Sequence, residues 1–296
     1  MIEKILDFSQ EPVSLKIKYQ QLVIIKDNQP DITIPINEIA VIIASHPQIS
    51  YTNAVLASLA ENGGIFIICD KKYLPIAMTL PLQSHYIQTQ RFLLQANVSL
   101  PTRKQLWKQI VQAKVKNQGK LLYKLYGNDQ GLLKMAHRVR SGDQDNIEAQ
   151  ASRRYWTTLF NDPSFKRNPQ KQDQNRFLNY GYAVLRAIVS RAICSAGLHP
   201  SLGLHHHNQY NPFCLADDLM EPFRPFIDQA VVELLKKYPE DHPLEPELKK
   251  QILSAITEKI NINQEKRTIF DSATKTANSL VKVYEGKEKK LILPEL

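Results

Sequence analysis

Residues 14–44 read SLKIKYQQLVIIKDNQPDITIPINEIAVIIA, and this stretch decides the fold class of the amino-terminal part. It is made of short runs rich in Val, Ile and Thr, which are residue types that favour strands. The turn-forming segment Asp27-Asn28-Gln29-Pro30 separates two of these runs. Some runs alternate between polar and apolar residues and others are apolar throughout, so we interpret them as antiparallel strands.

The residues that follow this stretch add one helix and further strands. Residues 51–62 (YTNAVLASLAEN) have helical apolar spacing, and Gly63-Gly64 ends the helix. Residues 65–69 (IFIIC) predict a buried strand, and residues 75–80 predict another. We therefore expect a β-rich, sandwich-like amino-terminal domain over residues 1–85.

From about Pro81 onward the apolar pattern changes to a period of 3.6 residues. Helices are predicted over residues 83–98, 102–126, 129–140, 146–160, 175–196, 218–238 and 245–260. Residues 280–296 resemble a short hairpin or a tail. The predicted fold class is α+β, with a mostly α-helical catalytic domain over residues 86–296.

Charge is distributed unevenly along the 296 residues, whose formal net charge is +9. Residues 1–90 carry six basic and eight acidic side chains, whereas residues 131–191 carry eleven basic and five acidic ones. A polyanion partner is therefore expected to bind the later part of the chain. Three scattered cysteines, with no signal sequence and no apolar run long enough to span a membrane, predict a cytoplasmic protein with reduced thiols and no membrane partner.

The densest group of chemically active residues is LGLHHHNQYNPFCLADDLMEPFR, residues 202–224. Imidazole and carboxylate groups together suit Mg²⁺ or Mn²⁺. Asp218 and Glu221 are three residues apart, so on a helix they would lie on one face. With Pro222 and Pro225 following, such a helix would start either near Asp218 or only at Glu221. The same spacing also fits a capping box, and the histidine run fits a solvated turn.

The second group is RVRSGDQDNIEAQASRRYW, residues 138–156. Asp145 is a plausible N-cap, and Glu148 then has two interpretations: it completes a capping box, or it is a carboxylate ligand in the first helical turn. Arg153 and Arg154 follow on the same helix, where they could hold a nucleic-acid backbone or form a solvated face. Motifs such as GxSxG, the P-loop, GxGxxG and HExxH are absent from the sequence.

Several segments, taken together and in order, resemble the CRISPR adaptation integrases, the family of CRISPR-associated protein one, and most resemble its type II branch. They are IPINEIAVII (34–43), HPQISYTNAVLASLAENGGIFIICD (46–70), LPIAMTLPL (74–82), SGDQDNIEAQASRRYW (141–156), LNYGYAVL (178–185), LHPSLGLHHHNQYNPF (198–213) and LADDLMEPFRP (215–225). The resemblance implies an enzyme that inserts short DNA spacers into a CRISPR array.

The resemblance also implies a set of site residues. The family pattern N-x-E-A selects Glu148, its L-G-hydrophobic-x-H register selects His206 among the three histidines, and its D-L-M-E pattern selects Asp218 and Glu221. Glu148, His206 and Glu221 are the implied catalytic residues and would hold one Mn²⁺ or Mg²⁺, with Asp218 as a fourth ligand or a residue behind the ligands. We expect DNA backbone contacts from Arg138, Arg140, Arg153, Arg154, Lys166 and Arg167.

The implied partners are double-stranded DNA, a second copy of the chain in a homodimer, and a small ferredoxin-like second core adaptation protein in a heterohexamer. Other type II CRISPR proteins are further candidates. Two alternative functions stay open from the sequence. One is a noncatalytic DNA-binding scaffold, and the other is a general metal-dependent nuclease acting on RNA or branched DNA.

Overall fold

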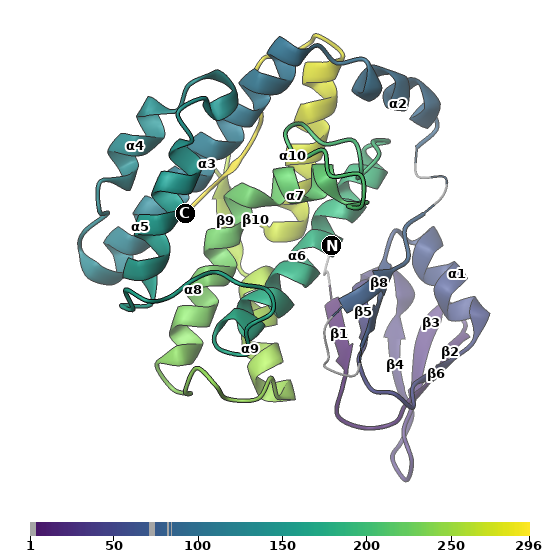
Figure 1. Cartoon of the computed structure of the whole chain (residues 1–296). Coiled ribbons are helices and arrows are strands. Elements are labelled where there is room, and N and C mark those ends of the chain that lie inside the picture. The colour runs from purple at the N-terminus through teal and green to yellow at the C-terminus, as the bar shows by residue number, and fades with distance from the viewer. Residues whose placement is uncertain (1–3, 71–74, 82, 84) are drawn as a thin grey trace.

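The computed structural model describes residues 4–70, 75–81, 83 and 85–296. Some residues used in the sequence argument therefore lie outside the described part, among them Glu3, Lys71, Lys72, Leu74, Leu82 and Ser84. Within the described part, strands dominate the beginning of the chain and helices dominate the rest, as Figure 1 shows. The predicted α+β class and the order of its two parts are confirmed.

One of two four-stranded sheets is the antiparallel unit that the sequence predicts. β2 (Ser14–Lys18), β3 (Gln21–Ile25) and β4 (Ile32–Pro35) pair antiparallel, and the short β6 (Ser50–Tyr51) adds to β2 in parallel. Tyr19 and Gln20 make the tight turn between β2 and β3 with φ values of 50° and 57°. Both values lie in the left-handed region that two-residue hairpin loops use.

The other sheet is mostly parallel, and here the antiparallel prediction is wrong. Its order is β1 (Lys4–Phe8), β5 (Ile39–Ala44), β7 (Ile65–Cys69) and β8 (Pro75–Met78), and only β7 and β8 run antiparallel. Helix α1 (Asn53–Glu61) lies between β5 and β7 in the chain and forms the crossover that parallel strands need. Strand β1 was not predicted from the sequence.

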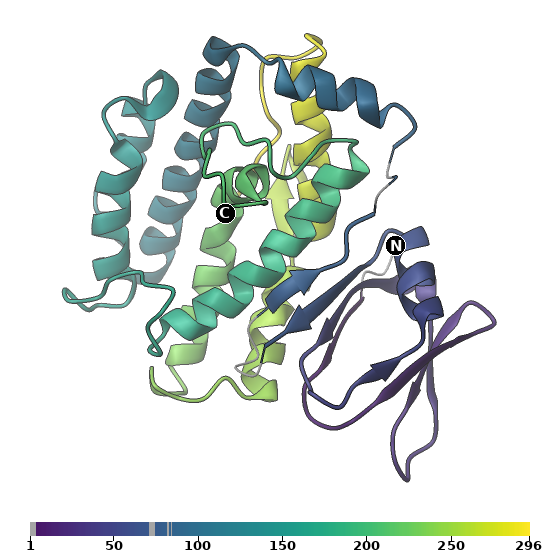
Figure 2. The same ribbon diagram turned by 45° about the vertical axis from the view of Figure 1, so that its right-hand side comes forward.

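This mixed sheet is buried on both faces, which explains why β5 is apolar throughout. One face packs against the antiparallel sheet, and Leu15, Leu22, Ile42 and Phe66 share that core. The opposite face joins the core of the helical part of the molecule. Figure 2 shows the strands of this sheet beside the helices. The predicted boundary at residue 85 falls between β8 and α2 and stays a prediction.

The helical part contains most of the predicted helices, with shifted ends. They are α2 (Gln88–Ala96), α3 (Leu100–Tyr126), α4 (Leu132–Arg138), α5 (Ile147–Leu159), α6 (Asn175–Ser195), α7 (Cys214–Met220), α8 (Arg224–Leu235) and α9 (Pro246–Thr257). Three short 3₁₀ turns accompany them, η1 (Ile36–Glu38), η2 (Ser141–Asp143) and η3 (Glu221–Phe223). The longest helix, α3, begins where Ser99 accepts the Thr102 N–H and ends at Gly127, whose φ is 69°.

The prediction of a hairpin or tail over residues 280–296 is wrong for its first part. Helix α10 (Ile269–Tyr284) occupies that part, and Thr268 caps it by accepting the Asp271 N–H. A three-stranded sheet of β9 (Lys259–Ile262), β10 (Glu265–Thr268) and β11 (Pro294–Glu295) surrounds the helix in sequence. The buried residues Ile269, Ala273 and Leu280 recur at helical spacing, and this spacing is the sequence signal for α10.

Two further sequence predictions can be compared with the structure. Cys69, Cys194 and Cys214 are thiols that form no disulfide within the described residues. Among the helices of residues 4–70, 75–81, 83 and 85–296, none combines the length and the apolar character that a membrane span requires.

Candidate active site

Glu148 stands in the first turn of α5, and the carboxylate of Asp143 fixes that turn. Asp143 accepts the N–H groups of Ile147 (2.9 Å) and Glu148 (3.0 Å). The prediction that Asp145 is the N-cap is therefore wrong, since Asp145 pairs with Arg140 instead. The physical reason is the η2 turn, where Gly142 and Asp143 have positive φ values of 72° and 52° and bring Asp143 over the helix start.

The side chain of Glu148 points away from its own helix end and towards α3. Its Oε1 lies 2.6 Å from Nζ of Lys114. The side chain is a quarter exposed, and the ammonium of Lys114 is nearly buried. The capping-box interpretation of Glu148 is therefore wrong, because a different group satisfies the carboxylate.

Glu221 lies at a break between two helices. Both predicted helix starts, at Asp218 and at Glu221, are wrong because α7 already begins at Cys214. Pro222 has no N–H to donate and cannot continue an α-helix without distortion, so the chain passes through the 3₁₀ turn η3 before α8 begins. This break turns the Glu221 carboxylate towards α3.

Two cations balance the buried Glu221 carboxylate. Arg224 Nε donates to Oε1 at 2.8 Å, and Lys114 Nζ lies 2.5 Å from Oε2. Burial alone would raise the pKa of Glu221, but Arg224 and Lys114 outweigh it and hold the pKa at about 2. Burial would lower the pKa of Lys114, and the charges of Glu221 and Glu148 instead raise it. The Glu221 carboxylate and the Lys114 ammonium are thus both ionised at neutral pH.

Asp218 organises the histidine segment. Its fully buried carboxylate accepts the N–H groups of Leu204 (2.6 Å) and His205 (2.9 Å) and contacts Nδ1 of His206 at 2.5 Å. Gly203 permits this approach, because a Cβ there would lie 3.1 Å from Asp218 Oδ2 and collide with the carbonyl of His206. Asp218 lies inside α7, so the capping-box alternative for it is wrong.

The three histidines have separate environments. His205 stacks on the buried indole of Trp107, with ring centroids 4.3 Å apart and planes 2° apart. His206 turns towards Asp218, whose hydrogen bond raises its pKa despite partial burial, and the charges of Glu221 and Glu148 add to this effect. His207 is exposed. The planes of the His205 and His206 rings are 86° apart, so the two side chains present different faces.

The structure thus brings Glu148 and Glu221 onto one ammonium group, with the His206–Asp218 pair in electrostatic range of both acids. In the described part of the chain, however, no group of three His, Cys, Asp or Glu side chains has an arrangement that could hold a metal ion as it stands. The ammonium of Lys114 lies where the two glutamates meet. The predicted ligand roles therefore stay predictions.

The predicted DNA-contacting residues divide into two kinds. Arg140 forms an ion pair with Asp145. The guanidinium of Arg167 donates to Asn175 Oδ1 (2.9 Å) and Asn179 Oδ1 (2.7 Å). Four others are exposed and form no ion pair within the described residues: Arg138, Arg153, Arg154 and Lys166. These four cations are the ones available to a polyanion.

A pocket of about 250 Å³ opens beside the paired acids. Lys114, Glu221, Arg224 and Arg167 line part of it, and Tyr182 and Asp228 line another part. The Tyr182 ring lies against both guanidinium groups, with Arg224 4.5 Å and Arg167 5.3 Å from its centroid. Burial raises the pKa of Asp228 to about 6, although the hydroxyls of Tyr182 and Tyr155 donate to it. The basic side chains make this pocket suitable for a phosphate.

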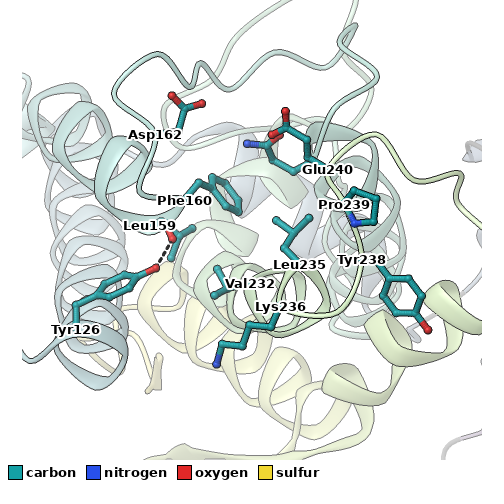
Figure 3. A pocket seen from close by; sticks show the side chains of 11 residues that line it. Tyr126, Leu159, Phe160, Asp162, Val232, Leu235, Lys236, Tyr238, Pro239 and Glu240 are labelled. Atoms are coloured by element: carbon teal, nitrogen blue, oxygen red, sulfur yellow. Dashed lines mark hydrogen bonds between the residues drawn. The ribbon is translucent and has the colours of Figure 1, made fainter.

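A second pocket of about 390 Å³ lies elsewhere, near the ends of α3, α5 and α8, and none of the predicted site residues lines it. Figure 3 shows Phe160, Val232 and Leu235 around its interior and Tyr126 and Tyr238 on opposite sides. The Tyr126 hydroxyl donates to the Leu159 carbonyl at 2.6 Å. Asp162, Glu240 and Lys236 also line it, but it lacks the two guanidinium groups found beside Glu221.

Sequence reasoning missed four residues that shape the site: Lys114, Arg224, Trp107 and Asn117. Asn117 Nδ2 donates to the Pro222 carbonyl at 2.9 Å and thereby supports the turn that carries Glu221. Three of the four lie on α3, and their spacing of three to seven residues places them on one helical face. That buried polar spacing, in an otherwise apolar stripe, is the sequence signal that could have revealed them.

Comparisons with known proteins show the family to which the chain belongs. The family model described as CRISPR associated protein Cas1 matches residues 8–260. The CRISPR-associated endonuclease Cas1 of Neisseria meningitidis serogroup C (strain 8013) is 37% identical over 286 residues, which cover 95% of this chain and 93% of that relative.

Two solved structures have the same fold. A casposase bound to integration product has a TM-score of 0.79 at 20% identity and covers 97% of this chain and 92% of its own. A Cas6-RT-Cas1–Cas2 complex has a TM-score of 0.74 at 17% identity and covers all of this chain and 36% of its own. With the family model spanning most of the chain and a relative this similar over nearly its full length, this chain belongs to the Cas1 family.

Proposed function

We propose that this chain is a metal-dependent DNA integrase and endonuclease of CRISPR adaptation. It inserts short DNA spacers into a repeat array by attack of a 3′-hydroxyl on repeat phosphodiesters. The observation that carries the proposal is the convergence of Glu148 from α5 and Glu221 from η3 on one cationic position. Family membership and the likeness to a casposase bound to integration product support the same reaction class.

The donor groups fit a divalent cation. Glu221 Oε2 is buried and forms no hydrogen bond within the described residues, and the Lys114 ammonium lies 2.5 Å from it. A buried carboxylate oxygen needs a cation to compensate for the loss of water, and a divalent ion could take that role in place of the ammonium. Glu148, Glu221 and the outer nitrogen of His206 offer the mixture of oxygen and imidazole donors that suits Mn²⁺ or Mg²⁺.

Asp218 is better suited to orient His206 than to bind a cation directly. Its oxygens already accept three backbone N–H groups, those of Leu204, His205 and His206, and contact Nδ1 of His206. A metal-binding histidine usually donates its other ring nitrogen to a carboxylate in this way. We therefore assign Asp218 the second of its two expected roles, behind the ligands.

The chain's own residues hold the reacting strands in this mechanism. A bound cation supplies Lewis acidity to the phosphodiester and lowers the pKa of the attacking hydroxyl. Arg224 and Arg167 border the adjoining pocket and would orient a phosphate there. No protein nucleophile is needed, in accord with the buried Cys194, whose pKa burial raises to about 11.

The partners follow from the same assignment. Double-stranded DNA is the substrate, and the exposed Arg138, Arg153, Arg154 and Lys166 are the proposed backbone contacts. We also propose a homodimer that joins a small ferredoxin-like second core protein and other proteins of a type II system. A structural relative solved within a Cas6-RT-Cas1–Cas2 complex supports the association with a second core protein.

Strand joining tests the proposal. A short duplex is incubated with a plasmid that carries a repeat array, in Mn²⁺ and in EDTA. We expect joined products only with Mn²⁺, and we expect Glu148→Gln to reduce joining by at least about 100-fold. Glu247→Gln, an exposed glutamate on α9, is the matched control and should join like the natural chain.

The outcomes separate the alternatives. Tight DNA binding without joining in either buffer would favour the noncatalytic scaffold. Cutting of RNA or branched DNA without rejoining would favour a general nuclease. Full activity of Glu148→Gln would remove Glu148 from the site.

A further inference from the structure

Lys114 is a charged side chain in an unusual place. It lies on the face of α3 that also buries Trp107, Val111 and Leu121, and the residue is only 8% exposed. Lysine is rarely so buried unless a paired charge compensates for the loss of water. Here the compensating charges are the two glutamates that the proposed function assigns to a divalent cation.

The ammonium is placed where a cation bound by both glutamates would be. Lys114 Nζ lies 2.6 Å from Glu148 Oε1 and 2.5 Å from Glu221 Oε2. Each oxygen ligand of Mg²⁺ lies about 2.1 Å from the ion, so two such ligands are at most about 4 Å apart. A divalent ion between these oxygens and the Lys114 ammonium in its observed position exclude each other by size and by charge.

The ammonium and a divalent ion would leave different net charges between the two glutamates. Lys114 and Arg224 together neutralise Glu148 and Glu221. A divalent ion added to this neutral group would leave excess positive charge in a largely buried place, which is costly. That excess is removed when the Lys114 side chain moves away or when phosphate groups arrive beside the ion.

The adjoining pocket provides room for both changes. Lys114 lines it together with Arg167 and Arg224, and its volume is about 250 Å³. A displaced ammonium can turn into this space without unfolding α3. A DNA phosphate in the same space would face Lys114 and Arg167 and would attract the ammonium away from the glutamates.

We propose that Lys114 is an internal counter-ion that holds Glu148 and Glu221 together, competes with the divalent cation for them, and so makes cation binding depend on the arrival of DNA phosphate. The inference rests on the proposed function. It makes Lys114 a positioning residue that acts through the two acids.

Mn²⁺ affinity, measured by electron paramagnetic resonance, tests the competition directly. Mn²⁺ is titrated into the natural chain, Lys114→Met and Lys116→Met. Each protein is measured first alone and then with a short DNA duplex whose ends lack the 3′-hydroxyl and cannot join. Lys116 is the matched control, because it lies on the same helix, is partly exposed and pairs with Glu295. Titration of the duplex alone is subtracted.

We expect Lys114→Met to bind Mn²⁺ at least about 10-fold more tightly than the natural chain in the absence of DNA, because the competitor is gone. DNA should tighten Mn²⁺ binding about 10-fold or more in the natural chain and in Lys116→Met, and by less than about 3-fold in Lys114→Met. Unchanged or weaker Mn²⁺ binding by Lys114→Met overturns the inference, as does an undiminished DNA effect.

Thermal unfolding guards against a folding defect. In EDTA, Lys114→Met should melt at least about 5 °C lower than the natural chain, since the two acids lose their shared cation, and saturating Mn²⁺ should restore most of that loss. Lys114→Gln, which keeps a donor without charge, provides a milder variant and should also tighten Mn²⁺ binding. A natural chain that binds Mn²⁺ and joins DNA, with no change in Mn²⁺ affinity on substitution, overturns this inference alone. A natural chain that does neither overturns the proposed function as well.

Discussion

The two halves of the site are built in different ways. Glu148 and Glu221 come from helix ends, are largely buried, and are held by Lys114 and Arg224. His206 comes from a loop, its side chain is 46% exposed, and the Asp218 carboxylate is the group that holds its ring. The acid half is assembled by buried ion pairs, and the histidine half is positioned on an exposed segment by contacts with Asp218 and Trp107.

This difference predicts that substitutions in the two halves change the stability of the fold and the rate of joining to different extents. A buried ion pair that loses one member leaves the other charge without compensation, which destabilises the fold strongly. When the half-exposed His206 imidazole is removed, the Asp218 carboxylate keeps its three backbone N–H donors and water can enter the vacated position. Substitutions in the acid half should therefore affect folding and reaction together, whereas substitutions in the histidine half should affect mainly the reaction.

The largest effect is expected for Glu221→Ala. The change leaves Arg224 without its carboxylate and Lys114 with Glu148 alone, so unfolding by denaturant should become easier by about 3–5 kcal/mol. Strand joining should also be lost.

Glu233→Ala is the matched control for this experiment. Glu233 lies on α8, is half exposed and pairs with Lys236, so its removal should change the free energy of unfolding by less than about 1 kcal/mol. Equal stability losses in the two variants would contradict the division between a buried, ion-paired half and the rest of the surface.

A smaller effect on stability, with a large one on activity, is expected for His206→Ala. Joining should fall by at least about 100-fold, while the free energy of unfolding should change by about 1 kcal/mol, the value of a typical hydrogen bond. Measured rates of joining and denaturant unfolding curves give the two quantities.

The neighbouring histidines serve as controls for His206. His205→Ala loses its stacking on Trp107 and should be destabilised by about 0.5–1.5 kcal/mol with a milder loss of joining. His207→Ala should lose the least stability and activity. His207 is exposed and has neither the ring stacking of His205 nor the carboxylate contact of His206 in the described structure. Equal losses of joining in all three variants would mean that the choice of His206 lacks support.

The smallest effect is expected from the surface of α5. Changing Arg153 and Arg154 together to Gln should leave both halves of the site intact and weaken duplex binding. The slope of log affinity against log salt concentration should become shallower by about 2, one unit for each lost phosphate contact. An unchanged slope would return these arginines to the role of a solvated helix face.

Much of the fold was predictable because its signals are local. The alternating runs of β2 to β4 and the apolar spacing of α6 follow from side-chain periodicity, and both are confirmed. The parallel pairing of β5 was not predictable from its own residues, since a strand buried on both faces looks the same in either direction. The break at Pro222 was visible as a proline, but the extent of α7 before it was not.

The candidate site divides in the same manner. Acids, histidines and arginines stand at family-like spacings in the sequence, and these motifs named Glu148, His206 and Glu221. The residues that hold the acids were missed, because a lysine on a long amphipathic helix usually faces water. Lys114 is 34 residues from Glu148 along the chain, and no local pattern links the two.

By itself the sequence determined which groups this protein can bring to a reaction, the succession of a strand-rich part and a helical part, and its family. Only the tertiary structure decided that α3 passes between α5 and η3, so that one buried ammonium meets two carboxylates. The physical reason is that periodicity and motifs depend on neighbours in the chain, whereas the environment of a buried charge depends on which distant elements pack around it.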